Sequence, residues 1–179
     1  MNLFFTTAKS TNDQENLAQI LNRIDKGESI TESNLVMAHA VITALEFNAS
    51  SLPYMIATET QLESCNLERT NLYGLDFKNG RIRNTSFSTA NLVKSSIFSC
   101  NLEQVNFKNC NLDRAEFTDV QFKEVSFDGA SLIGASFDNC DLSGIDFGMT
   151  KLDGTHFFGC VLDETTKILP GVILKESIT

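Results

Sequence analysis

One period dominates this sequence. Every fifth residue from Leu62 to Leu162 is Leu, Ile or Phe, through 21 consecutive units without an insertion. A second in-phase position lies two residues before each of these, from Thr60 to Cys160, and nearly all of its residues are no larger than Val. The residue between the two positions is usually Asn, Asp, Ser, Gln or Glu. The pattern predicts two inward-facing side chains in each unit of five.

A period of five fits neither regular element, because a helix repeats its inward face every 3.6 residues and a strand every 2. Two inward side chains followed by three further residues require a short extended segment and then a turn. The chain must therefore bend after each unit and bury the same two positions each time. A fixed period of this kind is typical of a stacked architecture in which each repeat covers its neighbour.

The units resemble the motif of the pentapeptide-repeat family, which is a small residue, Asp or Asn, Leu or Phe, and two polar residues. The resemblance covers about 105 of the 179 residues. It implies an all-β fold, a right-handed quadrilateral β-helix with four units per coil, in which residues twenty apart stack on one face. The units closest to the motif are Cys65-Asn66-Leu67-Glu68-Arg69, Ala90-Asn91-Leu92-Val93-Lys94, Cys110-Asn111-Leu112-Asp113-Arg114 and Cys140-Asp141-Leu142-Ser143-Gly144.

Residues 1–59 are expected to cap one end of the 60–164 repeat region. Thr11 to Gln14 offers helix N-caps with an acid in the first turn, and Gly27 is a stop signal. We therefore predict an amphipathic helix at about 12–26 that covers the open end of the first coil. Its apolar residues at helical spacing are Leu17, Ile20, Leu21 and Ile24.

Two alternatives remain open for residues 28–59. The stretch from Leu35 to Phe47 could form a second helix, since Ala, Leu and Met favour helices. The fivefold phase also runs backwards through this segment, which fits a divergent first coil or two equally well. Pro53-Tyr54 disturbs that phase and is expected to mark a loop.

The tail, residues 165–179, is apolar around Pro170-Gly171. It could cap the last coil, or it could provide a dimer contact. The chain is accordingly expected to be a monomer or a homodimer that associates through a terminal segment.

All five cysteines occupy the small inward position, which predicts packing rather than metal binding. Cys140 and Cys160 should stack at a separation that a disulfide could span, but the odd number of cysteines favours the reduced state. Neither His39 nor His156 belongs to a convergent nucleophile, base and acid set. The sequence therefore predicts no catalytic residue, no cofactor and no metal, and a chain that is not an enzyme.

The formal net charge is −9, which argues against nucleic acid as a ligand because an acidic chain repels phosphate. No apolar run approaches the roughly 20 residues that a membrane span requires. The first ten residues lack the basic and apolar regions of a signal peptide. We expect a bacterial protein of the cytoplasm.

The charge is polarised along the chain, with +2 over residues 60–109 and −8 over residues 110–164. This acidic half could bind a basic partner or could simply keep the rod soluble. Apolar side chains at outward positions add a second candidate surface. The candidate partner-binding residues are Glu116, Asp119, Glu124, Asp128, Asp138, Asp141, Asp146 and Asp153 from the acidic half, and Tyr73, Val93, Phe98 and Ile133 from the apolar set.

Two functions are compatible with these features. The first is a non-enzymatic protein-binding scaffold or adaptor, which presents flat β faces to other proteins. The alternative comes from the family resemblance: quinolone-resistance proteins of the Qnr type resemble duplex DNA in shape and charge, and they occupy the DNA-binding site of DNA gyrase or topoisomerase IV. The absence of an inserted loop and the basic N-terminal half of the repeat region depart from that type.

Overall fold

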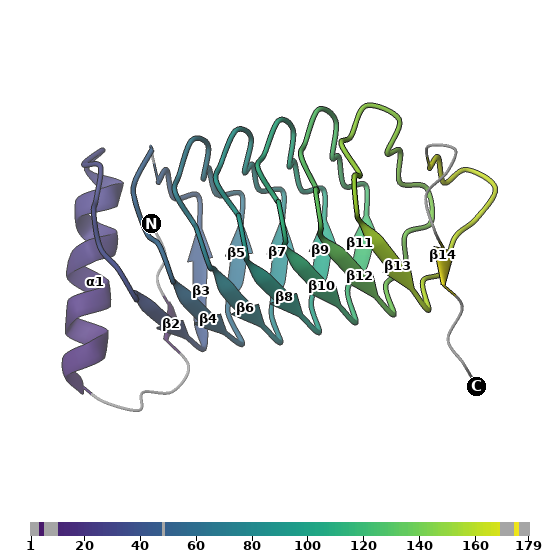
Figure 1. Cartoon of the computed structure of the whole chain (residues 1–179). Coiled ribbons are helices and arrows are strands. Elements are labelled where there is room, and N and C mark those ends of the chain that lie inside the picture. The colour runs from purple at the N-terminus through teal and green to yellow at the C-terminus, as the bar shows by residue number, and fades with distance from the viewer. Residues whose placement is uncertain (1–3, 6–10, 48, 169–173, 176–179) are drawn as a thin grey trace.

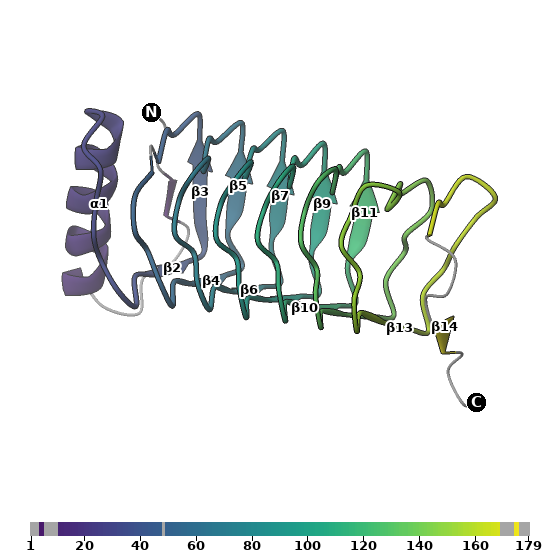
Figure 2. The ribbon, with the colours of Figure 1, turned by 45° about the horizontal axis from the view of Figure 1, so that its top comes forward.

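The computed structural model of the chain describes residues 4–5, 11–47, 49–168 and 174–175. These residues form a rod of stacked coils, and helix α1 (Thr11–Asp25) lies across one end (Figure 1). Figure 2 shows the same succession of coils from a second direction. The predicted all-β repeat fold with an N-terminal helical segment is confirmed.

Two ladders of short strands run along the rod, one with eight strands and one with six. Pairing is parallel throughout, except that β1 is antiparallel to β3. The eight-stranded ladder contains β2 (Val36–Ala38), β4 (Ile56–Thr58), β6 (Asp76–Lys78), β8 (Ser96–Phe98), β10 (Glu116–Thr118), β12 (Ser136–Asp138), β13 (His156–Phe158) and β14 (Leu174–Lys175). The six-stranded ladder contains β1 (Phe4–Phe5), β3 (Ala40–Thr43), β5 (Gln61–Glu63), β7 (Arg81–Arg83), β9 (Asn101–Glu103) and β11 (Gln121–Lys123).

The other two sides of each coil are held by isolated parallel bridges, such as Asn71 with Asn91 and Asn106 with Ser126. Each coil therefore has four faces, and equivalent residues in adjacent coils lie twenty positions apart. We name the two bridge-bearing faces after their inward columns. The leucine face covers Leu52, Leu72, Leu92, Leu112, Leu132 and Leu152, and the phenylalanine face covers Phe47, Leu67, Phe87, Phe107, Phe127 and Phe147.

Corners between faces are made by residues with a left-handed backbone, for example Asn109 (φ 55°), Asp119 (φ 54°) and Gly134 (φ 68°). This conformation is uncommon for residues other than glycine, although Asn and Asp tolerate it. The stacking provides a compensating hydrogen bond, because the Asn109 amide donates to the Asp128 carbonyl in the next coil at 2.9 Å. The two polar residues that end each unit thus form the bend that the fivefold period requires.

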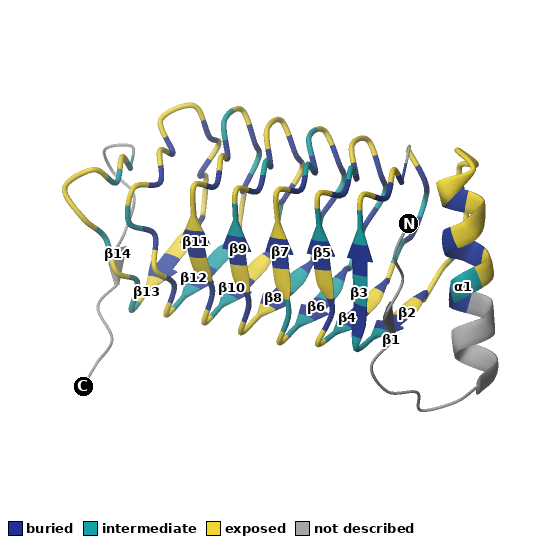
Figure 3. Cartoon of the chain, turned by 180° about the vertical axis from the view of Figure 1, so that it is seen from behind, coloured by how far each residue is buried: buried dark blue, intermediate teal, exposed yellow. Residues whose placement is uncertain are grey.

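The core is a continuous ladder inside the coils. Between residues 60 and 157, both in-phase positions of every unit are buried except at Gly80, which is partly exposed. Phenylalanine rings stack along two columns, with centroids 5.3 Å apart for Phe107 and Phe127 and 4.8 Å apart for Phe117 and Phe137. Figure 3 shows the resulting alternation of buried and exposed residues along the strands.

The helix α1 packs over β2 and buries one side. The helix ends at Asp25. Gly27 (φ 80°) follows it, and the Gly27 amide donates to the Ile24 carbonyl at 2.8 Å, as expected for a glycine beyond a helix C-terminus. Its apolar residues join the same core as the coils, so the helix closes the apolar end of the ladder. They are Leu17, Ile20, Leu21 and Ile24.

The segment 28–59 forms coils and not a second helix. Thr31 bridges Ser51, β2 and β3 enter the two ladders, and Glu46 bridges Asn66. The interpretation of Pro53-Tyr54 as a loop is wrong. Tyr54 (φ 59°) is a regular corner, and its amide donates to the Tyr73 carbonyl at 2.7 Å.

The twenty-residue register changes after the last regular units, since Asp146 bridges Lys167 and Phe157 pairs with Leu174. Asp163 organises the turn that produces this change. Hydrogen bonds from Thr165, from the Gly144 amide and from Thr166 lower the pKa of its carboxyl to about 2.

The tail predicted as a cap or a dimer contact lies largely outside the described residues. Of the residues 165–179, the structure describes 165–168 and 174–175. Ile168 is partly buried against the core.

Gly80 supports a prediction that the small-residue pattern alone would not give. A Cβ atom at this position would lie 2.4 Å from the Thr60 carbonyl oxygen and 2.5 Å from a ring carbon of Phe77. We expect Gly80→Ala to lower the free energy of unfolding by about 1 to 3 kcal/mol through overpacking, measured by chemical denaturation.

The matched control is Cys110→Ala, because the neighbours of Cys110 in its column, Ala90 and Ala130, already show that alanine fits there. A Gly80→Ala protein as stable as the unsubstituted chain would contradict the close approach of Thr60 and Phe77.

Candidate protein-interaction surface

The leucine face has an unusual composition in its N-terminal half. Between residues 51 and 94 its outward residues include two tyrosines, one cation and no carboxylate, although the chain as a whole carries 23 acidic residues. Interface cores are typically depleted of acidic residues and enriched in tyrosine. The outward residues here are Ser51, Pro53, Tyr54, Asn71, Tyr73, Gly74, Asn91, Val93 and Lys94.

The two tyrosines pack against each other on this face. The rings of Tyr54 and Tyr73 meet edge to face, with centroids 5.4 Å apart and an interplanar angle of 81°. A side chain at residue 74 would block this arrangement, since a Cβ atom on Gly74 would lie 2.8 Å from the Tyr54 ring. On the other side of Tyr73, the Lys94 ammonium lies 5.7 Å from the ring centroid, within the range of a cation–π interaction.

An asparagine ladder holds the backbone beneath the tyrosines. Asn91 donates from Nδ2 to Asn71 Oδ1 at 2.9 Å, and Asn71 donates from Nδ2 to Ser51 Oγ at 3.1 Å. Asn71 Oδ1 also accepts from the Tyr73 amide, and Asn91 Oδ1 from the Val93 amide. The outward side chains therefore stand on a backbone fixed both along the chain and between coils, so little further ordering is required when a partner binds.

The apolar surface continues around the corner onto the eight-stranded ladder. Val36 and Ile56 are register partners on β2 and β4, and they are 49% and 39% exposed. Tyr54, at the corner itself, is 51% exposed. We call this set the tyrosine edge, defined as Val36, Tyr54, Ile56, Tyr73 and Val93.

Only part of the predicted apolar set belongs to the tyrosine edge. Tyr73 and Val93 do, whereas Phe98 lies on β8, two strands beyond β4 in the same ladder. Ile133 lies farther along the leucine face, beyond Asp113, which accepts from the Ile133 amide at 3.1 Å. Sequence reasoning missed Val36, Tyr54 and Ile56, although the fivefold phase runs back through all three and could have placed them.

The predicted acidic residues do not gather on one face. Glu116, Asp119 and Asp138 lie on the eight-stranded ladder or at its corner, and the other five are divided among the remaining three faces. These five are Glu124 and Asp141 on the six-stranded side, Asp128 and Asp146 on the phenylalanine face, and Asp153 on the leucine face.

Several of these carboxylates have an ion-pair or hydrogen-bond partner in a neighbouring coil. Asp128 pairs with Lys108 at 2.9 Å and Asp146 with Lys167 at 2.6 Å. The hydrogen bond from Lys167 also lowers the pKa of the Asp146 carboxyl. Glu124 accepts from Gln104 at 2.8 Å. The acidic half is thus less negative locally than its sequence suggests.

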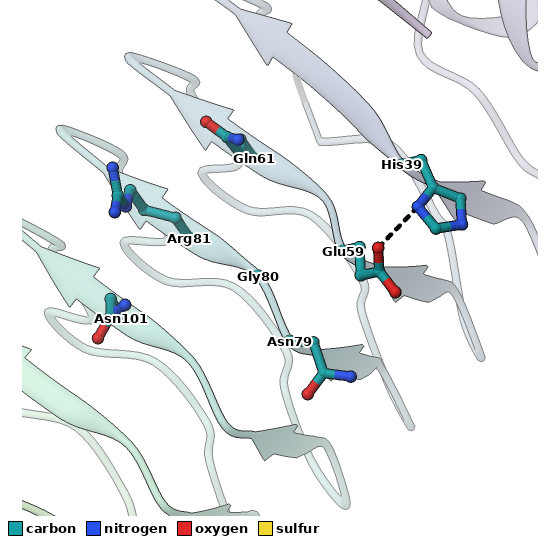
Figure 4. A pocket seen from close by; sticks show the side chains of 7 residues that line it. All are labelled: His39, Glu59, Gln61, Asn79, Gly80, Arg81 and Asn101. Atoms are coloured by element: carbon teal, nitrogen blue, oxygen red, sulfur yellow. Dashed lines mark ion pairs between the residues drawn. The ribbon is translucent and has the colours of Figure 1, made fainter. Parts of the chain in front are cut away.

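A shallow polar depression of about 430 Å³ lies where the eight-stranded ladder turns into the six-stranded one. Figure 4 shows its side chains arranged coil after coil, with His39 Nδ1 2.9 Å from Glu59 Oε2 as the pair drawn in contact. Its other lining residues are Gln61, Asn79, Gly80, Arg81 and Asn101. Because the side chains rise from successive coils without converging, the depression offers hydrogen bonds rather than an assembled reaction centre.

Within the described ranges, no group of three or more His, Cys, Asp or Glu residues is arranged to hold a metal ion. In the same ranges, no helix combines the length and the apolar character needed to cross a bilayer.

Comparison with known proteins identifies the repeat. Residues 60–137 match the family described as pentapeptide repeat region. Together with the four-faced coil, this match identifies residues 60–137 as a pentapeptide-repeat region. The comparison with curated proteins gave no match.

Among solved structures, the chain is similar to QnrB1, a plasmid-mediated fluoroquinolone resistance protein, with a TM-score of 0.46, 15% identity and coverage of 80% of this chain and 91% of that one. It is also similar to HetL of the cyanobacterium Nostoc sp. strain PCC 7120, which is involved in heterocyst differentiation regulation, with a TM-score of 0.34, 14% identity and coverage of 89% and 93%. For Rfr23 of the cyanobacterium Cyanothece 51142 the TM-score is 0.28, with 17% identity and coverage of 84% and 97%.

Proposed function

We propose that this chain is a non-enzymatic scaffold of the bacterial cytoplasm, and that it binds a partner protein through the tyrosine edge. The observation that carries the proposal is the contact between Tyr54, which is exposed, and Tyr73, which is partly buried, on a face that lacks carboxylates between residues 51 and 94. The five free cysteines are in keeping with a reducing compartment.

Three properties support this surface over the rest of the rod. Tyrosine supplies a large amphipathic contact area at a low cost in conformational entropy. Val36 and Ile56 extend the apolar area across the corner, so a partner could bury a continuous patch. The hydrogen-bonded backbone beneath the rings favours binding without rearrangement.

The test is capture of a partner by the tagged full-length chain from lysate of its native host, followed by quantification of that partner with variants. We expect Tyr54→Ser combined with Tyr73→Ser to reduce capture about tenfold or more, since buried tyrosines are frequent hot spots. Ile133→Ser is the matched control, because it removes an exposed apolar side chain from the same face outside the tyrosine edge.

Melting curves of both variants establish that the fold is retained. Equal capture by the double variant and the unsubstituted chain would contradict this assignment of the binding surface.

A second candidate is binding to DNA gyrase or topoisomerase IV as a mimic of DNA. It is favoured by Glu116, Asp119 and Asp138, which share one side of the rod in adjacent coils and have no ion pair among the described residues. A supercoiling assay with titrated protein, with and without a quinolone, tests it. If the chain binds these enzymes, it should change supercoiling, and the combined variant Glu116→Gln, Asp119→Asn and Asp138→Asn should abolish that change. Unchanged supercoiling at micromolar protein would contradict this candidate function.

A further inference from the structure

Two cysteines stack at the C-terminal end of the coils, and we call them the terminal cysteine pair, Cys140 and Cys160. Both occupy the small inward position at the start of the six-stranded side. The next residues, Asp141 and Val161, form a parallel bridge, and the Val161 amide donates to the Cys140 carbonyl at 2.9 Å. The two cysteines are therefore in register on neighbouring coils.

The surroundings of the two sulfur atoms repeat from one coil to the next. Cys140 Sγ lies 3.4 Å from the Phe117 carbonyl oxygen, and Cys160 Sγ lies 3.2 Å from that of Phe137. Each sulfur also lies near the carbonyl two residues before it, at 3.5 Å from Asp138 O and 3.6 Å from Phe158 O. The side chains thus point the same way, one coil apart.

One coil rise of about 4.8 Å between the Cα atoms falls inside the range of roughly 4.4 to 6.8 Å that disulfides span. A rotation of the side chains about χ1 would then bring the sulfur atoms into bonding distance.

The other three cysteines have no such neighbour. The residues twenty positions before and after them are Leu45 and Thr85 for Cys65, Gly80 and Val120 for Cys100, and Ala90 and Ala130 for Cys110. All three are buried, whereas Cys160 is partly exposed at the end of its column. Among the five thiols, this pair alone combines a cysteine neighbour with access to solvent.

We propose that the terminal cysteine pair is a site of reversible oxidation, at which a low-molecular-weight disulfide such as oxidised glutathione converts Cys140 and Cys160 into an intramolecular disulfide. The Cys160 thiolate attacks one sulfur of the external disulfide, and one glutathione thiolate leaves. Cys140 then loses its proton and attacks the Cys160 sulfur, expelling the second glutathione thiolate. Two protein thiols and one external disulfide become one protein disulfide and two glutathione thiols.

The order of attack follows first from access, because Cys160 is partly exposed whereas Cys140 is fully buried. The interaction between the two thiols supports the same order. A hydrogen bond from Cys140 lowers the pKa of the Cys160 thiol, and the same bond together with burial raises the pKa of Cys140. The thiolate is the nucleophile in thiol–disulfide exchange. Cys160 is therefore the attacking residue and Cys140 the resolving one.

The experiment treats the reduced full-length protein with oxidised glutathione, alkylates the remaining thiols under denaturing conditions, and maps the peptides by mass spectrometry. The proposal predicts a Cys140–Cys160 cross-link, alkylation of the other three cysteines, and reversal by dithiothreitol. The oxidised protein should also melt several degrees higher, because the new bond restricts the unfolded chain.

Variants separate the two roles. Cys140→Ser should stop at a glutathione adduct on Cys160, Cys160→Ser should leave Cys140 unreacted, and the control Cys110→Ser should still form the cross-link. If a variant does not fold, the peptide map of the unsubstituted chain still tests whether the Cys140–Cys160 disulfide forms. A lasting glutathione adduct on its Cys160, a disulfide-linked dimer, or five unreacted thiols would each overturn the proposal.

Discussion

Replacing Phe107 with alanine is expected to lower the free energy of unfolding by about 3 to 5 kcal/mol. Phe107 is fully buried, and its ring stacks between those of Phe87 and Phe127 at centroid distances of 5.2 and 5.3 Å. It also meets Phe117 edge to face across the interior, at 6.5 Å. The substitution leaves a cavity lined by three rings whose backbones are fixed by hydrogen bonds between coils, so the site cannot collapse to fill it.

Urea unfolding followed by far-ultraviolet circular dichroism measures this loss. The matched control is Phe98→Ala, which removes the same side chain from an outward position that is 39% exposed. We expect the control to cost much less than the core variant, since surface substitutions away from special contacts have small effects. Equal losses for the two variants would contradict the inward assignment of Phe107.

The second large effect is expected in the helix that closes the rod. Leu21 of α1 is fully buried within the same core cluster as the coils. Leu21→Ala should destabilise the protein by about 2 to 5 kcal/mol by forming a cavity between the helix and the first coil. Because terminal caps keep the apolar end of a solenoid from associating, the variant should also aggregate more readily.

The melting temperature and light scattering on heating test both consequences. Gln19→Ala, on the exposed side of the same helix, is the control and should behave like the unsubstituted chain. A Leu21→Ala protein with unchanged melting and scattering would mean that α1 does not contribute to closing the core.

The sequence predicted the core well because the fold repeats one local solution. A unit of five can bury the same two positions only if the chain bends after each unit, so the fivefold pattern revealed the inward residues without any knowledge of contacts. The stacking of Phe117 on Phe137 and of Phe107 on Phe127 follows from four units per coil. The helix could be predicted equally well from the sequence, since its apolar spacing and Gly27 are local signals.

Sequence reasoning was wrong or undecided where local chemistry and coil geometry point in different directions. Pro53-Tyr54 has the composition of a loop, yet the hydrogen bond from the Tyr54 amide to the Tyr73 carbonyl of the next coil holds Tyr54 in a regular corner. Residues 28–59 contain good helix formers, and the ladder of hydrogen bonds from the next coil overrides that preference.

The acidic half looked like one surface because charge was counted along the chain. A coil distributes consecutive residues around four faces and brings Lys108 to Asp128, which are twenty residues apart. The tyrosine edge depends on the same geometry, because Gly74 makes room for a ring that comes from the preceding coil.

The central claim is that the backbone winds as a four-sided coil that advances by one strand spacing for every twenty residues. A distance between two outward positions tests this claim most directly. Parallel bridges connect Ser51 to Lys151 through five successive coils, which places the two backbones about 24 Å apart at one strand spacing per coil. Dipolar electron paramagnetic resonance between nitroxides at these two sites, in a Cys160→Ser background, should give one narrow distribution near that distance. A broad distance distribution would contradict the account. So would a single maximum that differs from the expected distance by one coil rise or more after the length of the label side chains is allowed for.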